Sequence, residues 1–185
     1  MQAVVPAGDF VAEEQPARRL LKPQVLAGTL GSGGGARKLL LLDSREPDEY
    51  TGATDPYEVA RAGHVPGAVS FPWRTTFEPE PPRGADQTWA DLLPCDTLRP
   101  RFVQALSLQG RPTAAAVEVG TYCTGGIRSG FLYLVLRECF SRGGAAGTPQ
   151  WQVQAKNYDG GMWQWADDES LPMVLGDTPA GDARG

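Results

Sequence analysis

Residues that usually hold metals are scarce in this sequence of 185 residues. It has one histidine, His64, and three cysteines, Cys95, Cys123 and Cys139, with no CxxC pair among them. A structural zinc site takes four Cys or His ligands at short spacings, so we expect no metal, and we expect no other cofactor. Hydrolysis by a Ser-His-Asp triad would need His64 as its base. An odd cysteine count without framework spacing is typical of free thiols in a reducing compartment, which predicts a cytoplasmic protein.

Long apolar runs and a positive charge balance are also missing. The longest apolar runs, 39–42 and 131–136, are far shorter than the ~20 residues of a spanning helix, so we expect no membrane segment. The N-terminus lacks a basic start followed by an apolar run, which argues against a targeting peptide. An organelle matrix or stroma stays possible if a transit peptide has been removed from the sequence. Lys and Arg total 17 against 22 Asp and Glu, a formal charge of −5. This balance argues against a nucleic-acid partner, which needs a clustered positive surface.

The sequence has enough apolar residues, 41%, for one sizeable core. Continuous apolar runs and helical spacing alternate along it, which predicts a central, mainly parallel sheet with helices on both faces, an α/β fold. We expect an N-terminal arm (1–22), one domain (23–175) and a flexible tail (176–185). Strands are predicted at 38–43, 68–71, 114–122 and 151–155, helices at 23–30, 96–109 and 128–140, helical turns at 47–50 and around Trp163 and Trp165, and loops at 74–94 and 141–150.

One short element combines a nucleophile with an anion-binding loop. The segment Cys123-Thr124-Gly125-Gly126-Ile127-Arg128 lies between a predicted strand ending near Tyr122 and a predicted helix beginning near Arg128. The thiol would face the helix N-terminus, where N–H groups are unpaired and the dipole is positive. The two glycines let successive N–H groups point inward, and the arginine adds a permanent cation. All three effects favour a reactive thiolate at Cys123 over a buried structural cysteine.

Together with four further segments, this loop resembles the rhodanese-like sulfurtransferases. The loop is similar to the six-residue active-site loop of that family, in which cysteine comes first. The order of the segments also agrees, and the resemblance extends over roughly residues 23–175. The other segments are Leu42-Asp-Ser-Arg-Glu-Pro-Asp-Glu-Tyr50, Gly63-His-Val-Pro-Gly-Ala68, Tyr158-Asp-Gly-Gly-Met-Trp-Gln-Trp165 and Ser170-Leu-Pro-Met-Val174, the last being typical of tandem-domain thiosulfate and mercaptopyruvate sulfurtransferases.

The resemblance implies transfer of a sulfane sulfur through a persulfide on Cys123. The donor would be thiosulfate, mercaptopyruvate or a persulfide, and the acceptor a thiol, including a protein thiol, or cyanide. Residues Thr124, Gly125, Gly126, Ile127 and Arg128 would bind the anionic sulfur. The chemistry requires no metal and no general base, and the resemblance gives His64 a structural place beside the first helix.

Two acidic residues depart from the family pattern. Tandem enzymes hold the anionic part of the donor with two arginines, and an ungapped count places Glu49 and Glu58 at those positions. Two carboxylates would repel small anionic donors, so we expect poor affinity for them. The loop also differs from those of the mercaptopyruvate and thiosulfate enzymes at Thr124 and Gly125. Arg74 is a candidate replacement cation, although a solvated loop position is the simpler expectation.

Several alternatives stay open. The same fold carries dual-specificity phosphatases and arsenate reductases, but these need Cys-x5-Arg, and Cys123 and Arg128 form the shorter Cys-x4-Arg. A rhodanese-like domain can also serve binding or regulation without catalysis. A redox pair of Cys123 with Cys139 is excluded, because a helix would separate them by about 15 Å. We expect Cys139 to be a core residue, whereas Cys95 is undecided, and the chain could be half of a tandem protein.

Overall fold

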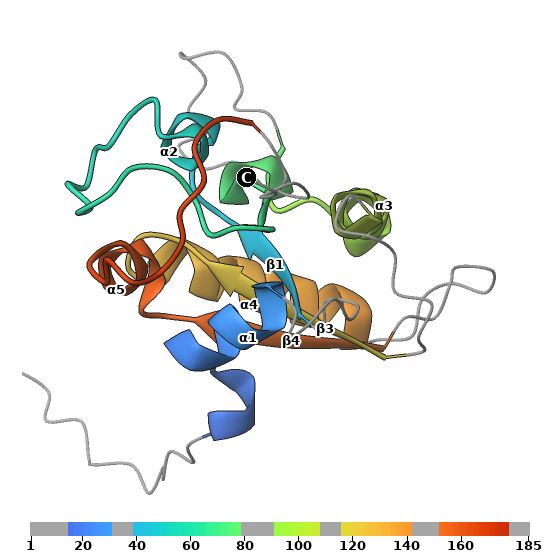
Figure 1. Cartoon of the computed structure of the whole chain (residues 1–185). Coiled ribbons are helices and arrows are strands. Elements are labelled where there is room, and N and C mark those ends of the chain that lie inside the picture. Colours follow the sequence, from blue (N-terminus) through green and yellow to red (C-terminus); the bar gives the residue numbers. More distant parts are fainter. Residues whose placement is uncertain (1–14, 31–38, 79–90, 108–115, 142–151, 178–185) are drawn as a thin grey trace, which may run out of the picture.

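The structure, a computed structural model, describes residues 15–30, 39–78, 91–107, 116–141 and 152–177 (Figure 1). In these ranges strands and helices alternate along the chain, as expected for an α/β fold. The strands are β1 (Leu39–Asp43), β2 (Val69–Ser70), β3 (Ala116–Tyr122) and β4 (Gln152–Tyr158). The helices are α1 (Lys22–Leu30), α2 (Pro47–Thr51), α3 (Cys95–Ser107), α4 (Ile127–Ser141) and α5 (Gly161–Ala166), with short 3-10 turns η1 (Pro16–Arg18) and η2 (Trp73–Thr76).

The four strands form one parallel sheet in the order β2-β1-β3-β4. The register places the carboxyl ends of three strands side by side, because Asp43 pairs with Tyr122, and Tyr122 pairs with Tyr158. Ligands of open parallel sheets bind at this edge. The residues that follow the three strand ends therefore determine the site.

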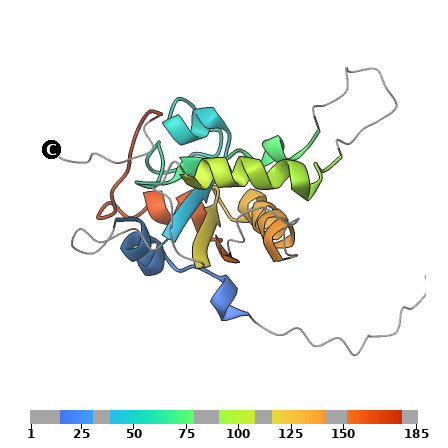
Figure 2. The same cartoon turned by 90° about the vertical axis from the view of Figure 1, so that its right-hand side faces the viewer.

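Both faces of the sheet are buried, which explains the continuous leucine run of β1. Leu40 and Leu42 belong to a core shared with α3 and α4. Leu39 and Leu41 belong to a second core that includes side chains from α1 and α5. Figure 2 shows α1 and α4 on opposite sides of the sheet. The predicted parallel sheet with helices on both faces is confirmed.

Several element boundaries differ from the sequence-based expectation. β4 extends to Tyr158, three residues beyond the predicted strand, because its whole length pairs with β3. α3 begins at Cys95 rather than after Asp96, which lies in its first turn. The predicted 74–94 loop contains all of η2 except its first residue, Trp73, and a bridge between Phe77 and Leu92. The expected 141–150 loop falls outside the described residues, apart from Ser141, the last residue of α4.

The described part of the expected N-terminal arm is packed against the sheet. The Leu20 amide donates a hydrogen bond to the Asn157 carbonyl oxygen (2.8 Å), and the Leu20 side chain is buried in the second core. Arg19 pairs with Asp159 at the end of β4 (3.1 Å). Packing on the sheet thus includes residues just before the predicted domain start at 23.

Cys95 and Cys139 form a disulfide that joins the first residue of α3 to the last part of α4. The expectation of three free thiols is therefore wrong, and Cys123 alone among the three cysteines is free. Cys139 is also a core residue, as expected, since it lies in the core shared by α3 and α4. Disulfides persist mainly in oxidising compartments, so this pair removes the thiol-based reason for expecting a cytoplasmic location.

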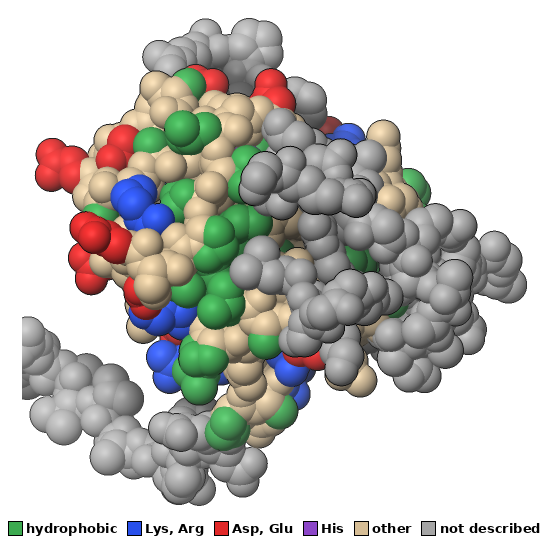
Figure 3. Space-filling view, in the orientation of Figure 1, with side chains coloured by type: hydrophobic (Ala, Val, Ile, Leu, Met, Phe, Trp, Pro, Cys, Tyr) green, Lys and Arg blue, Asp and Glu red, His purple; other side chains and the backbone are tan. Residues whose placement is uncertain are grey.

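The surface and the helices add two observations. On the face shown in Figure 3, the described Lys and Arg side chains lie scattered among acidic and apolar ones and do not join into a continuous basic surface. Among the described residues, every helix is too short or too polar to cross a bilayer.

Candidate active site

The loop that begins with Cys123 lies where β3 ends and α4 begins. Cys123 directly follows Tyr122, the last residue of β3, and Ile127 is the first residue of α4. The thiol is buried, and the Gly126 N–H donates a hydrogen bond to Cys123 Sγ at 3.1 Å. The first N–H groups of α4 have no acceptor within the helix and give this end a positive dipole. The predicted meeting of thiol and helix N-terminus is therefore present.

The loop needs glycine at Gly126 for two reasons. Its φ of +89° lies in the left-handed region, which other residues rarely adopt. A Cβ there would also lie 2.8 Å from the carbonyl oxygen of Asp159, just after β4. The same residue supplies the N–H that reaches the sulfur, so its backbone conformation directly sets the environment of the thiol.

Helix α5 holds the loop from the other side. The Met162 N–H donates to the Cys123 carbonyl oxygen (2.9 Å), and the Trp163 N–H donates to the Thr124 carbonyl oxygen (3.0 Å). Gly161 permits this approach, because a Cβ on it would come within 2.4 Å of both carbonyl oxygens. The C-terminal motif therefore supports the loop through backbone hydrogen bonds.

Arg128 forms a bidentate ion pair with Glu49 of α2. Its two terminal nitrogens donate to Glu49 Oε2 (2.6 Å) and Oε1 (2.8 Å), and one also donates to Thr124 Oγ1 (2.9 Å). Burial disfavours the charged form of Arg128, but hydrogen bonding to Glu49 and the charges of Glu49 and Cys123 outweigh it, and its pKa is raised. Burial likewise opposes ionisation of Glu49, but the Arg128 guanidinium lowers its pKa. Both groups are therefore charged at neutral pH.

The two acidic residues that depart from the family pattern, Glu49 and Glu58, lie in different environments. Glu49 is buried and its charge is balanced by Arg128. It therefore does not present a free carboxylate to a donor, contrary to the expectation from the sequence. It is held in place by the N-terminal turn of α2, where Glu46 and Glu49 form a reciprocal capping box. Glu58 is exposed and has a positive φ of 53°. Arg74 is exposed and paired with Glu46 at 3.0 Å, consistent with a solvated position.

A cavity of about 190 Å³ opens over the thiol. Two of the residues that line it, Tyr57 and Trp163, come from outside the loop and are aromatic. The loop itself contributes the apolar residue Ile127. The Arg128 guanidinium lies 4.9 Å from the centre of the Tyr57 ring. The lining residues are Tyr57, Cys123, Thr124, Gly125, Ile127, Arg128 and Trp163.

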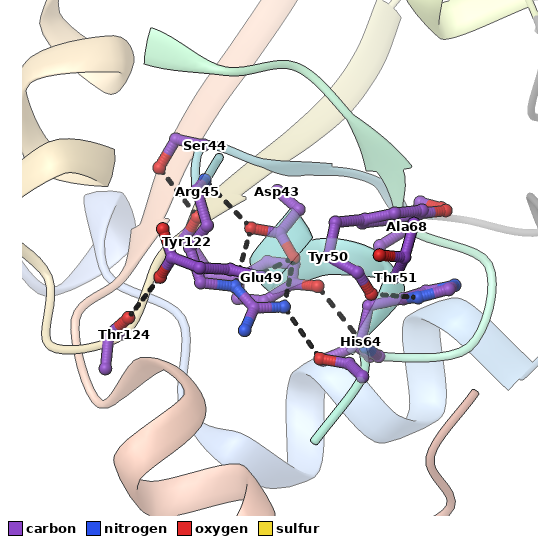
Figure 4. A network of polar contacts seen from close by, with 12 residues as sticks. Asp43, Ser44, Arg45, Glu49, Tyr50, Thr51, His64, Ala68, Tyr122 and Thr124 are labelled. Carbon is purple, nitrogen blue, oxygen red and sulfur yellow. Dashed lines mark hydrogen bonds and ion pairs between the residues drawn. The ribbon is translucent and has the colours of Figure 1, made fainter. Parts of the chain in front are cut away.

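A network of polar side chains lies near the ends of β1 and β3 and along α2 (Figure 4). Asp43, the last residue of β1, forms an ion pair with Arg45 (2.7 Å), and Arg45 also donates to the Gly63 carbonyl oxygen (2.8 Å). The fully buried His64 stacks on Tyr50 of α2, with Nδ1 2.8 Å from the Tyr50 carbonyl oxygen. His64 thus has structural contacts, as the resemblance implied, but they are with the second helix, α2, and not with the first.

The family model of the rhodanese-like domain matches residues 26–168. The chain belongs to the rhodanese-like family. A thiosulfate sulfurtransferase of Pseudomonas aeruginosa is 32% identical over 154 residues, which are 83% of this chain and 46% of that protein. One of Azotobacter vinelandii is 29% identical over 170 residues, 92% of this chain and 51% of the relative.

Solved structures agree with this assignment. A crystal structure of a probable thiosulfate sulfurtransferase has a TM-score of 0.54 and 26% identity, covering 90% of this chain and 52% of that one. The Tum1 protein of Saccharomyces cerevisiae, at 18% identity, shares the fold with a TM-score of 0.57, covering 88% of this chain and 48% of its own. The rhodanese-like chain spans about half the length of the curated relatives it matches.

The structure brings all six predicted loop residues to one place, and five of them line the cavity. Gly126 contributes its N–H to the thiol instead. Two residues outside the loop, Tyr57 and Trp163, were not expected at the site and line the cavity. Glu49 was expected there as a carboxylate that repels the donor, and it is instead the partner of Arg128. Trp163 lies in a motif that carried the resemblance, but that motif alone does not show which way its ring points.

Proposed function

We propose that this rhodanese-like domain transfers sulfane sulfur through a persulfide on Cys123. The observation that carries the proposal is the free thiol at the N-terminus of α4, with the Gly126 N–H 3.1 Å from Sγ, inside a cavity large enough for a small donor. The relatives named thiosulfate sulfurtransferases support it.

Two displacement steps account for the transfer. In the first, the Cys123 thiolate bonds to the outer sulfur of the donor, and the donor's bond to that sulfur breaks, its electron pair leaving with the remainder of the donor. In the second, a thiol or cyanide bonds to the transferred sulfur, and the electron pair of the broken S–S bond returns to Cys123. The Gly126 N–H and the dipole of α4 stabilise the anionic sulfur between the two steps. A thiol acceptor loses its proton to solvent.

The site gives less support to phosphatase or arsenate reductase chemistry. Those reactions need a loop that surrounds a tetrahedral oxyanion and an arginine directed at it. Here Arg128 directs both terminal nitrogens at Glu49. Its charge is therefore already balanced within the protein, whereas a single transferred sulfur needs only the thiol and the loop N–H groups.

Intact-mass measurement of the purified chain after treatment with sulfur donors tests the proposal. We expect a gain of one sulfur atom that is lost on adding a thiol. Cys123→Ser should abolish the gain, because it removes the nucleophile. A matched Cys95→Ala, Cys139→Ala double variant should keep it, since those sulfurs are bonded to each other.

Two outcomes would overturn the proposal. The first is an equal gain of sulfur in the Cys123→Ser variant, which would place the chemistry elsewhere. The second is no gain with thiosulfate, mercaptopyruvate or an organic persulfide, which would favour a non-catalytic binding domain.

A further inference from the structure

The thiol of Cys123 is surrounded by large apolar side chains that face solvent. Tyr57 is 48% exposed, Trp163 is 56% exposed and Ile127 is 87% exposed, and all three line the same cavity. Single exposed apolar side chains need no explanation, but a cluster of them marks a binding surface. Because the cluster lines the cavity at the candidate nucleophile, a substrate that reaches the thiol would contact it.

The two rings are held in place by contacts inside the protein. Trp163 Nε1 donates to the Tyr57 carbonyl oxygen (3.3 Å), which connects α5 to the segment between α2 and β2. The Trp163 ring also packs closely on the loop, because a Cβ at Gly125 would lie 2.3 Å from it. The Tyr57 ring lies against the Arg128 guanidinium, 4.9 Å from the ring centre. An incoming donor therefore meets two rings that already have contacts inside the protein, so little side-chain freedom is lost on binding.

The charges of the site favour a donor with little charge of its own. Arg128 is the cation among the lining residues, and its guanidinium is matched by Glu49, at 2.6 and 2.8 Å, and covered by the Tyr57 ring. The pair contributes no net charge, whereas the reacting thiolate contributes a negative one. A small dianion such as thiosulfate thus meets repulsion without a free cation to offset it.

From these contacts we infer that the cavity selects sulfane-sulfur donors with an aromatic or bulky apolar body and at most one negative charge. Tyr57 and Trp163 are the specificity-determining residues. An apolar cavity of about 150 Å³ holds a benzene ring, and this one measures about 190 Å³. The inference rests on the proposed sulfur transfer. With an aryl thiosulfonate, Cys123 bonds to the outer sulfur, and the sulfonyl–sulfur bond breaks with its electron pair leaving on the aryl sulfinate.

Two donors with the same reacting group test this selectivity. Benzenethiosulfonate and methanethiosulfonate are both monoanions that release a sulfinate, and they differ by a phenyl against a methyl group. The rate at which each loads Cys123 is measured by intact mass in single turnover on the full chain. It is divided by the rate of the same donor with N-acetylcysteine, which removes the difference in intrinsic reactivity. An apolar pocket distinguishes even one methylene by about tenfold or more, so we expect at least a tenfold preference for the phenyl donor.

Variants assign the preference to the rings. Trp163→Ala and Tyr57→Ala should each reduce the normalised phenyl preference severalfold, because each removes an aromatic ring from the cavity lining. Leu134→Ala is the matched control, since Leu134 is another exposed apolar residue, 56% exposed, outside the cavity lining. A wild-type preference near one, or a preference that both ring variants keep, would overturn the inference. Loading by thiosulfate but by neither thiosulfonate would overturn it as well, whereas loading by none of these donors would contradict the sulfur-transfer proposal itself.

The charge part of the inference has its own test. Thiosulfate and methanethiosulfonate are similar in size but carry two charges and one. Glu49→Gln leaves Arg128 with an unbalanced positive charge, so it should raise the loading rate of thiosulfate relative to methanethiosulfonate about tenfold. An unchanged or lower ratio in this variant would show that the Glu49–Arg128 pair does not set the charge preference.

Discussion

Breaking the disulfide between Cys95 and Cys139 should destabilise the domain without removing its thiol chemistry. The two residues are 44 positions apart in the sequence and link the start of α3 to the end of α4. In the chain-entropy model, closing a loop of that length lowers the entropy of the unfolded chain enough to stabilise the folded state by about 4 kcal/mol. Reduction of the bond should remove this amount.

Unfolding in urea gives the measurement. The free energy of unfolding falls by roughly 2 kcal/mol per molar urea for a domain of this size, so a reductant should lower the wild-type midpoint by about 2 M. Tryptophan fluorescence can follow the transition, because Trp165 is fully buried between α5 and the sheet. A Cys95→Ala, Cys139→Ala variant should unfold near the reduced wild-type midpoint and should not respond to the reductant.

Sulfur loading provides the control on function. Arg99 of α3 also donates to the Cys139 carbonyl oxygen (2.7 Å), so the two helices remain connected when the bond is broken. We therefore expect the Cys95→Ala, Cys139→Ala variant to load sulfur on Cys123 at the wild-type rate below its unfolding transition. The measurement is made without reductant, because a reductant would remove the transferred sulfur. Identical midpoints with and without reductant, or a reductant response in the double variant, would refute the reasoning from loop closure.

Two further predictions concern the active-site loop. The Arg128 guanidinium lowers the pKa of Glu49 below its ordinary value of 4.5. Their ion pair therefore stabilises the fold above that pH, and this stabilisation is lost as the pH falls through the lowered value. At pH 7, Glu49→Gln should lower the free energy of unfolding by about 2 kcal/mol. That gap should close in urea unfolding at acid pH, and a gap that widens on acidification would contradict the assignment. Gly126→Ala should destabilise the domain by about 1–2 kcal/mol and slow sulfur loading of Cys123 at least tenfold, since a Cβ would meet the Asp159 backbone and displace the N–H from the sulfur; unchanged kinetics with a folded variant would refute this role.

The sequence by itself determined the sheet, because a strand that is buried on both faces consists of consecutive apolar residues. The leucines of β1 form an unbroken apolar run, and alternate ones enter the two opposite cores. The end of β4 was harder to predict, since Lys156 and Asn157 are polar and are kept in the strand by pairing with β3. Pairing between distant strands leaves no local signal, so boundaries that depend on it are visible only in the fold.

The candidate active-site loop could also be proposed from the sequence, because its parts are contiguous. A thiol, two glycines and an arginine within six residues, placed between a strand and a helix, determine the local chemistry through backbone geometry and the helix dipole. The donor preference could not be located in this way. It depends on residues that the chain brings together from far apart.

Only the tertiary structure decided which groups act on the thiol from outside the loop. Glu49 meets Arg128 across 79 positions, and Trp163 meets Tyr57 across 106. Whether a carboxylate repels a donor or balances an arginine depends on a distance of a few ångströms, because charge interactions fall off with separation and burial changes their strength. In the sequence the glutamate suggested repulsion, and in the fold it is the partner of the arginine that the loop itself supplies.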